Sequence, residues 1–173
     1  RYLGSGVTIT RDPETGIRNE SILRVQLTDD PHKAPFWMAA RHNYQHYLKY
    51  VERDEPMPMA FAIGLHPVYE IMSNWSGIHK DFDELEYAAG VLGEDIEMVQ
   101  CETIDLEVPA HAEIVIEGTV HPTERMMEGP FGEFTNFGFG AEGPAPVFTC
   151  SAITHRKDPI FRHMQATWFT DHQ

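Results

Sequence analysis

The second half of the chain alternates apolar and polar residues, and this pattern constrains the possible folds more than any other feature of the sequence. The alternating segments are residues 96–99, 104–108 and 112–118, and a further strand is expected at residues 147–154. Successive side chains of a strand point to opposite faces, so each alternating segment predicts a strand with one face in contact with water. No strand–helix–strand rhythm recurs here, which favours an α+β fold built on an antiparallel sheet or barrel.

The first half of the chain predicts a hairpin, one buried strand and three helices. Asp12, Pro13 and Gly16 supply turn chemistry between segments 7–10 and 22–27, which are therefore expected to pair as a hairpin. The expected helices are residues 35–53, 66–75 and 83–92, and the expected buried strand is residues 59–63.

Charge and composition exclude several classes of partner. The sequence has 13 basic and 27 acidic residues, a formal net charge of −14, which argues against nucleic acid or an anionic membrane. No apolar run approaches the roughly 20 residues that cross a bilayer, and no signal peptide opens the sequence. The two cysteines, Cys101 and Cys150, are expected to be small core residues in strands, and the predicted location is cytoplasmic.

The two ends of the sequence do not resemble natural termini. No initiator methionine precedes Arg1, and large apolar residues occur within residues 166–170, close to the other end. Domain ends are usually polar and loosely ordered. We therefore expect residues 1–173 to be the central segment of a longer polypeptide.

Residues 128–133, with the sequence Glu-Gly-Pro-Phe-Gly-Glu, are the most unusual stretch of the chain. Glycine lets the backbone approach a ligand closely, and proline stiffens the turn between Glu128 and Glu133. Carboxyl groups held near each other or near an apolar surface acquire displaced pKa values that suit acid–base chemistry. The alternative is a solvated surface loop that is acidic without a catalytic role.

Arg24 occupies an unusual position for a charged residue. The expected strand places it on one face together with Ile22 and Gln26. Its five N–H donors then require carboxylates or a phosphate, and the acidic loop at residues 128–133 could supply them. The alternative is that its side chain extends along a sheet edge to reach water.

Asn19, His42 and Glu84 are candidate metal ligands, although their spacing fits no short motif. His42 and His46 share one face of an expected helix, and such a pair can bind zinc. No glutamate follows the first histidine as in the HExxH pattern. His46 is therefore interpreted as a surface histidine.

Several segments together resemble the UbiD family of decarboxylases, which use prenylated FMN. The matching positions are residues 9–16, 19–24, 83–88, 101–110, 112–118, 128–133 and 153–160, together with His42. The resemblance implies a flavin-reductase-like split β-barrel flanked by helices. It also implies that residues 1–173 form the central cofactor- and metal-binding segment, without the family's N-terminal and C-terminal domains. The segment alone is therefore expected to be inactive.

The same resemblance implies a flavin site with a divalent metal. Asn19, His42 and Glu84 take the positions of the family's metal ligands, usually for manganese, which bridges the protein to the flavin phosphate. The other implied cofactor-binding residues are Ser21, Ile22, Leu23, Arg24, Met38, Ala39, Ala40, Arg41 and Asn43. Family members often hold potassium as well, but residues 74–80 lack the Pro-rich, Ser-Met character found there, so no potassium ligand is assigned.

Arg24, Glu128 and Glu133 match the family's catalytic set. The resemblance implies that Glu133 donates a proton, while Arg24 holds both carboxylates and orients the substrate. The implied reaction is a reversible, non-oxidative decarboxylation of an aromatic or α,β-unsaturated carboxylic acid. The implied partners are a small carboxylic acid substrate, a flavin prenyltransferase that supplies the cofactor, and further copies of the full-length protein in a homo-oligomer.

Two other functional classes stay open at this point. One is a non-catalytic flavin- or metal-binding module related to flavin reductases, and the other is a subunit of a multi-subunit carboxylase. The joint presence of Arg24, Glu128 and Glu133 disfavours the first class, because binding alone does not require that set.

Overall fold

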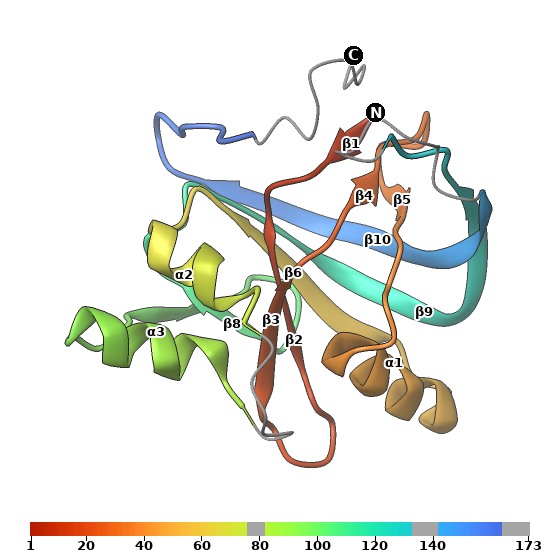
Figure 1. The fold of residues 1–173 in the computed structure, drawn as a ribbon. Coiled ribbons are helices and arrows are strands. Elements are labelled where there is room, and N and C mark those ends of the chain that lie inside the picture. The colour runs from red at the N-terminus through yellow and green to blue at the C-terminus, as the bar shows by residue number, and fades with distance from the viewer. Residues whose placement is uncertain (76–81, 133–141, 164–173) are drawn as a thin grey trace.

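The computed structural model describes residues 1–75, 82–132 and 142–163. An antiparallel sheet dominates these residues, with strand order β3-β2-β6-β9-β10-β5 (Figure 1). Its strands are β2 (Val7–Arg11), β3 (Arg18–Ile22), β5 (Lys33–Pro35), β6 (Met57–Ile63), β9 (Ile114–Glu128) and β10 (Gly143–His155). The smaller pairs are β1 (Tyr2–Leu3) with β4 (Val25–Gln26), and β7 (Met98–Gln100) with β8 (Glu107–Pro109).

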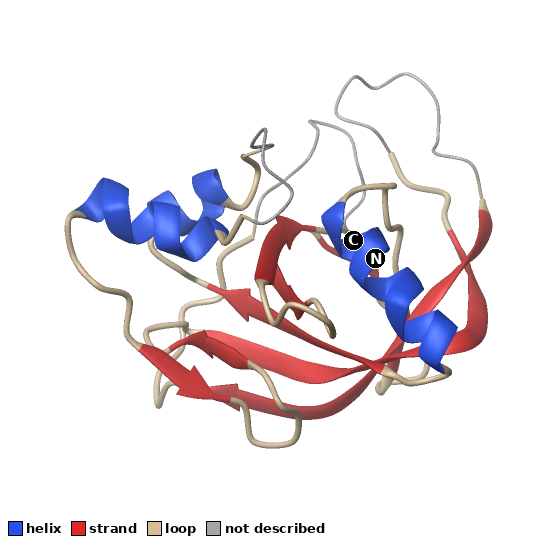
Figure 2. Cartoon of the chain, turned by 90° about the horizontal axis from the view of Figure 1, so that it is seen from below, coloured by secondary structure: helices blue, strands red, loops and turns tan. Residues whose placement is uncertain are grey.

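The helices are α1 (His42–Arg53), α2 (Pro67–Met72) and α3 (Glu84–Leu92). They lie on the same side of the long β9–β10 ribbon (Figure 2). The α+β class and the antiparallel sheet are as expected, whereas the strands of the described residues do not close into a barrel. Within the described ranges, no helix is long and apolar enough to cross a membrane.

The continuous apolar run in β6 is explained by cores on both faces of the sheet. Met57, Met59 and Phe61 belong to one cluster, which also contains Tyr47 and Tyr50 of α1 and is covered by that helix. The alternate residues of β6 belong to a second cluster with apolar residues of β2 and β8. A strand buried on both faces needs no polar alternation, and the expected buried strand is confirmed.

The hairpin turn is confirmed, but its second strand lies earlier than expected. Asp12 Oδ1 accepts a hydrogen bond from the Glu14 N–H at 2.8 Å, and Gly16 has a φ of 77°. The chain then pairs at once, so β3 runs over Arg18–Ile22 instead of residues 22–27. The later part of the expected strand instead contributes β4, which pairs with β1.

The expected helix start at residue 35 is wrong, because this segment is extended. Pro35 pairs with Val147 of β10, and the Phe36 N–H donates to the Pro146 carbonyl at 3.2 Å. Phe36 is fully buried in the α1 core cluster. Phe36, Trp37 and Ala40 match the spacing of a helix but precede it, and α1 begins at His42.

The remaining elements have the expected type but different lengths. The strand expected at residues 112–118 covers the start of β9, and the strand expected at 147–154 covers the later part of β10. β9 and β10 form a long ribbon with two register shifts. Strands expected at 96–99 and 104–108 shorten to β7 and β8, and the helix at 66–75 shortens to α2. Cys101 is buried but outside any strand, and Cys150 is half-buried in β10.

Gly118 is expected to be indispensable where β9 pairs with β10. A Cβ atom there would lie 2.0 Å from the Thr149 carbonyl oxygen and 2.9 Å from the Phe148 ring. Gly118→Ala should therefore destabilise the protein by about 3 kcal/mol, since neither neighbour can move freely. Gly90→Ala in α3 is the control, because nothing lies within 4 Å of its Cβ and alanine favours the helix. Thermal unfolding of the full-length variants measures the difference, and equal midpoints would contradict it.

Candidate functional site

A cavity of about 550 Å³ lies where β3, the residues before α1 and the start of α3 come together. The expected flavin- and metal-binding residues that line it are Asn19, Ser21, Ile22, Leu23, Met38, Ala39, Ala40, Arg41, His42, Asn43 and Glu84. These residues are far apart in the sequence but meet because β3 contacts all three helices. Arg24 is the expected cofactor contact that does not line the cavity.

Alternation along β3 sends its polar side chains to different helices. Asn19 Nδ2 donates to Asn43 Oδ1 at 2.5 Å, and Asn43 Nδ2 donates to Ser21 Oγ at 2.5 Å. Asn19 and Ser21 therefore face α1, where Asn43 joins them. Glu20, between them, lies on the side of α3.

Asp83 and Glu84 attach the start of α3 to β3. Asp83 caps the helix by accepting a hydrogen bond from the Leu85 N–H at 3.0 Å, and its carboxylate forms an ion pair with Arg18 at 2.9 Å. Glu84 Oε2 accepts a hydrogen bond from the Glu20 backbone N–H at 2.9 Å. These contacts hold the Glu84 carboxylate, which is only 3% exposed, in the wall of the cavity.

Glu20 is a buried carboxyl group with no donor for its oxygens among the described residues. Burial raises the pKa of Glu20 well above its usual range, and the charges of Asp83 and Glu84 raise it further. Burial also raises the pKa of Glu84, although hydrogen bonds from Glu20 and the charge of His42 oppose this shift. Two buried carboxyl groups that face each other can be joined only through a shared proton or a cation.

The residues around the cavity fit a divalent metal ion in their chemistry. An amide oxygen, an imidazole and a carboxylate are suitable ligands for manganese. The orphaned Glu20 carboxyl group lies in the same wall, where a cation would favour its ionised form. In the part of the chain that the structure describes, no three His, Cys, Asp or Glu side chains form a metal cluster by themselves. The metal assignment therefore relies on Asn19 as a third ligand and stays a prediction.

Arg24 and Glu128 form a bidentate ion pair beyond the end of β3. Arg24 Nε lies 3.1 Å from Glu128 Oε1, and Arg24 Nη2 lies 3.2 Å from Glu128 Oε2. The Glu128 side chain is 1% exposed and that of Arg24 is 19% exposed. The acidic loop therefore supplies a carboxylate to Arg24, as expected, and the alternative of an arginine that extends to water is excluded for this residue.

Aromatic and polar side chains surround this ion pair. The Arg24 guanidinium lies 4.4 Å from the centre of the Phe131 ring, which meets Tyr2 edge-on at 4.8 Å. Burial and the charge of Glu128 raise the pKa of Tyr2 to about 12. The Gly129 N–H donates to Gln26 Oε1 at 3.0 Å and fixes the start of the acidic loop.

The sequence matches the model of the UbiD family, described as the 3-octaprenyl-4-hydroxybenzoate carboxy-lyase Rift-related domain, over residues 1–167. The chain belongs to the UbiD family. Relatives from Archaeoglobus fulgidus and Aquifex aeolicus are 36% and 37% identical over 162 residues. Each match covers 93% of this chain and 33% of the relative, so the chain spans about a third of their length.

Solved structures of UbiD-class enzymes have a similar fold. An evolved dimeric form of HmfF from Pelotomaculum thermopropionicum, in complex with prenylated FMN, is 40% identical with a TM-score of 0.89. The match covers 94% of this chain and 37% of that chain. The closed form of vanillic acid decarboxylase from Sedimentibacter hydroxybenzoicus is 28% identical with a TM-score of 0.85, over 94% of this chain and 35% of that chain.

A more distant likeness concerns the fold alone. A putative flavin reductase with a split barrel domain from Shewanella frigidimarina is 11% identical with a TM-score of 0.58. The match covers 91% of this chain and 69% of that chain. The UbiD-family segment therefore shares its general arrangement of elements with a flavin-reductase fold.

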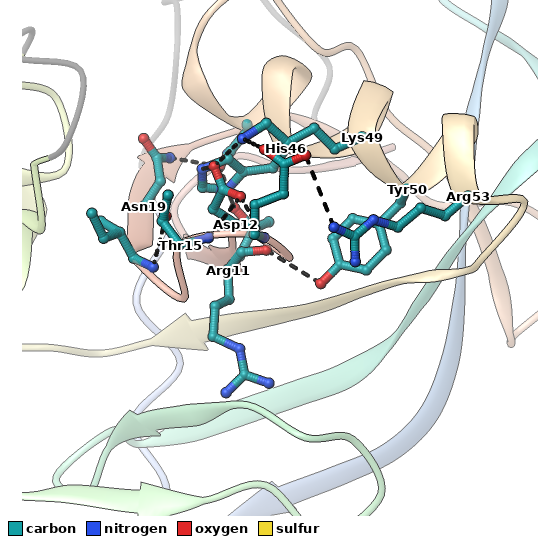
Figure 3. Close-up of polar contacts among 12 residues, drawn as sticks. Arg11, Asp12, Thr15, Asn19, His46, Lys49, Tyr50 and Arg53 are labelled. Atoms are coloured by element: carbon teal, nitrogen blue, oxygen red, sulfur yellow. Dashed lines mark hydrogen bonds and ion pairs between the residues drawn. The ribbon is translucent and has the colours of Figure 1, made fainter.

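The interpretation of His46 as a surface histidine is wrong. Its side chain in α1 is buried, with Nδ1 3.1 Å from Thr10 Oγ1 and Nε2 3.8 Å from Asp12 Oδ2. Figure 3 shows the ring pointing toward Asp12 and Lys49. Burial lowers the pKa of His46 to about 4, against the opposing charge of Asp12. The sequence places Thr10 and Asp12 in a distant hairpin, so the helical pattern alone did not show this contact.

The structure brings most of the expected flavin- and metal-binding residues together in one cavity. Glu133 lies outside the described residues, so its position relative to Arg24 stays a prediction. Sequence reasoning missed Glu20 and Tyr2, which contribute to the cavity wall and to the surroundings of Glu128. A glutamate on a strand between two polar residues was a possible signal for Glu20, whereas nothing local indicated Tyr2.

Proposed function

We propose that this chain is the central cofactor- and metal-binding segment of a UbiD-type decarboxylase that uses prenylated FMN. The observation that carries the proposal is the single cavity lined by the metal-binding positions and by all the expected flavin contacts except Arg24. Arg24, which forms the ion pair with Glu128, directly follows Ile22 and Leu23 in the sequence, and these two residues line that cavity. The complexes of HmfF with prenylated FMN and with FMN support the choice of cofactor.

Asn19, His42 and Glu84 would hold manganese through an amide oxygen, an imidazole nitrogen and a carboxylate oxygen. The bound ion would neutralise the charge that Glu20 and Glu84 place in the buried wall, and would attract the phosphate of the flavin. Ser21, Ile22 and Leu23, with residues 38–43, would form the remaining contacts to the cofactor. We assign potassium no ligand in this chain.

Prenylated FMN, when bound, supplies the electron sink for loss of carbon dioxide. The protein residues orient the substrate and move a proton. Arg24 would bind the substrate carboxylate while its bidentate contact with Glu128 fixes the guanidinium plane. Glu133 would then donate a proton to the carbon from which the carboxylate has left. The substrate class is an aromatic or α,β-unsaturated acid, and the reaction is reversible in principle.

The whole protein would carry further domains on either side of this segment. In the whole protein the sheet of this segment would belong to a split β-barrel that resembles the barrel of flavin reductases. A flavin prenyltransferase would supply the cofactor. Assembly into a homo-oligomer is supported by the dimeric form of HmfF. A role as one subunit of a larger decarboxylase is the second candidate, favoured by the likeness to the vanillic acid decarboxylase named VdcCD, one structure of which contains a truncated VdcD.

The test of the proposed function is the loss of metal and flavin together in Glu84→Gln. Changing groups that merely support metal ligands typically weakens metal binding about 10- to 100-fold, so losing a ligand should cost at least as much. Metal analysis and flavin absorbance of the purified full-length protein measure both contents. Glu86→Gln, on the same turn of α3 but exposed, is the matched control. Full manganese occupancy in Glu84→Gln would remove Glu84 from the ligand set.

A further inference from the structure

A continuous chain of hydrogen bonds runs from the α1–β2 contact to the cavity wall. Thr10 Oγ1 lies 2.7 Å from Asn43 Oδ1 and 3.1 Å from His46 Nδ1. Asn43 Oδ1 also accepts the hydrogen bond from Asn19 Nδ2 at 2.5 Å. All four side chains are more than nine-tenths buried, so water cannot replace any of these contacts.

The orientation of the Asn43 amide, with Oδ1 toward Thr10 and Asn19, gives this chain a direction. Asn43 Oδ1 is an acceptor, so Thr10 must use its one hydroxyl hydrogen on Asn43. Toward His46 the Thr10 hydroxyl can then only accept, which requires a proton on His46 Nδ1. The order is therefore His46 Nδ1–H to Thr10 O–H to Asn43 Oδ1, and Asn43 Oδ1 receives the Asn19 N–H₂ from the other side.

The opposite direction is self-consistent as well but has a different result for Asn19. If His46 Nδ1 were the acceptor, Thr10 would donate to it, and Asn43 would turn its N–H₂ group toward Thr10 and Asn19. Asn19 would then offer its oxygen to Asn43 and its N–H₂ to the cavity. Such a group repels a cation, whereas the amide oxygen binds it.

We propose that His46, acting through Thr10 and Asn43, orients the Asn19 amide so that its oxygen instead of its nitrogen faces the metal. This inference rests on the proposed function, in which Asn19 is a metal ligand. Figure 3 shows the Asn19 oxygen pointing away from the polar cluster around Asp12 and His46, while its nitrogen points toward that cluster. His46, Thr10 and Asn43 are thus positioning residues.

The surroundings of His46 favour the required tautomer. His46 Nε2 lies 3.8 Å from Asp12 Oδ2, too far for a hydrogen bond, whereas Nδ1 lies within hydrogen-bond distance of Thr10. Asp12 is already engaged by Lys49 at 2.6 Å and by the Glu14 N–H. The lowered pKa of His46 keeps the ring neutral, with one proton to place. When that proton is on Nδ1, Thr10 Oγ1 accepts the hydrogen bond from it.

The test measures Mn²⁺ binding to the full-length protein in the presence of FMN, from the electron paramagnetic resonance signal of the free ion. Thr10→Val keeps the shape of the side chain but breaks the chain, and should weaken Mn²⁺ binding about 10- to 100-fold, as is typical when the support of a ligand is lost. His46→Asn places an amide donor at the Nδ1 position, so its Mn²⁺ binding should stay within about threefold of that of the unsubstituted protein. His46→Gln places the amide near the Nε2 position instead, so its Mn²⁺ binding should be weakened as in Thr10→Val.

A second comparison separates orientation from general damage to the fold. In an Asn19→Asp background both ends of the side chain are oxygen atoms, and Asn43 must turn its N–H₂ group toward them. Either orientation of residue 19 then offers oxygen to the metal, so Thr10→Val should change Mn²⁺ binding less than about threefold. Equal losses in both backgrounds would overturn the inference. Unchanged binding in Thr10→Val alongside a loss in Glu84→Gln would overturn it while leaving the proposed metal site in place. An unsubstituted protein that binds FMN but no Mn²⁺ would overturn both.

Discussion

Replacing Glu133 by glutamine in the full-length protein is expected to lower the decarboxylation rate by about a hundredfold or more while the flavin stays bound. Glutamine keeps the shape of the side chain but cannot transfer a proton to the carbon that loses its carboxylate. The residues that would bind the flavin and the metal lie in the cavity formed by β3, residues 38–43 and α3, and the substitution changes none of them.

Parallel assays of turnover and bound flavin measure this result. Glu142→Gln is the matched control, because Glu142 is an exposed glutamate at the other end of the same connection between β9 and β10. A solvated acidic loop would tolerate Glu133→Gln within about twofold, the behaviour expected of a group that takes no part in proton transfer. Turnover at the unsubstituted rate, with flavin bound, would therefore refute the role of Glu133 as proton donor.

The elements that the sequence predicted correctly are those specified by local chemistry. The turn at Asp12–Gly16 needs only an aspartate that accepts from the following backbone and a glycine at positive φ. The helix at α3 carries its own start signal in Asp83, which caps it. Such features involve residues that are neighbours in the chain, and a pattern of neighbours can show them.

The elements that were predicted wrongly depend on contacts with residues far away in the sequence. Phe36 follows an extended segment because β10 lies beside it, and His46 is buried because β2 brings Thr10 and Asp12 against α1. The expected strand at residues 112–118 continues to Glu128 because β10 pairs with it as far as Gly143, through two register shifts. No local periodicity contains this information, since it arises only when the sheet has formed.

The candidate site was predictable in its members but not in its internal support. Resemblance to the UbiD family identified most of the residues that line the cavity, although not Glu20. The sequence did indicate that Arg24 required a carboxylate, and Glu128 provides it. The hydrogen bonds that hold Asn19, and the orphaned carboxyl group of Glu20, depend on three-dimensional contacts between β3, α1 and α3.

Arg24→Ala is expected to have two separable effects, a loss of activity and a loss of stability. Glu128 is 1% exposed, so removal of Arg24 leaves a buried carboxylate without its bidentate partner. Breaking a buried ion pair in this way costs about 3 kcal/mol, at the lower end of the usual range because the Arg24 side chain is 19% exposed. Activity should fall at least about a hundredfold, since the substrate carboxylate also loses its partner.

The double variant Arg24→Ala, Glu128→Gln distinguishes these effects. A neutral amide at residue 128 removes the unpaired charge, so most of the lost stability should return. Activity should not return, because neither residue can then bind the substrate carboxylate or balance its charge. Arg24→Lys is the matched control for charge alone, and it should keep much of the stability but lose the bidentate geometry and with it most of the activity. Thermal unfolding and turnover of the three full-length variants measure both quantities. If activity recovered together with stability in the double variant, the Arg24–Glu128 pair would be a structural ion pair and the catalytic assignment would fall.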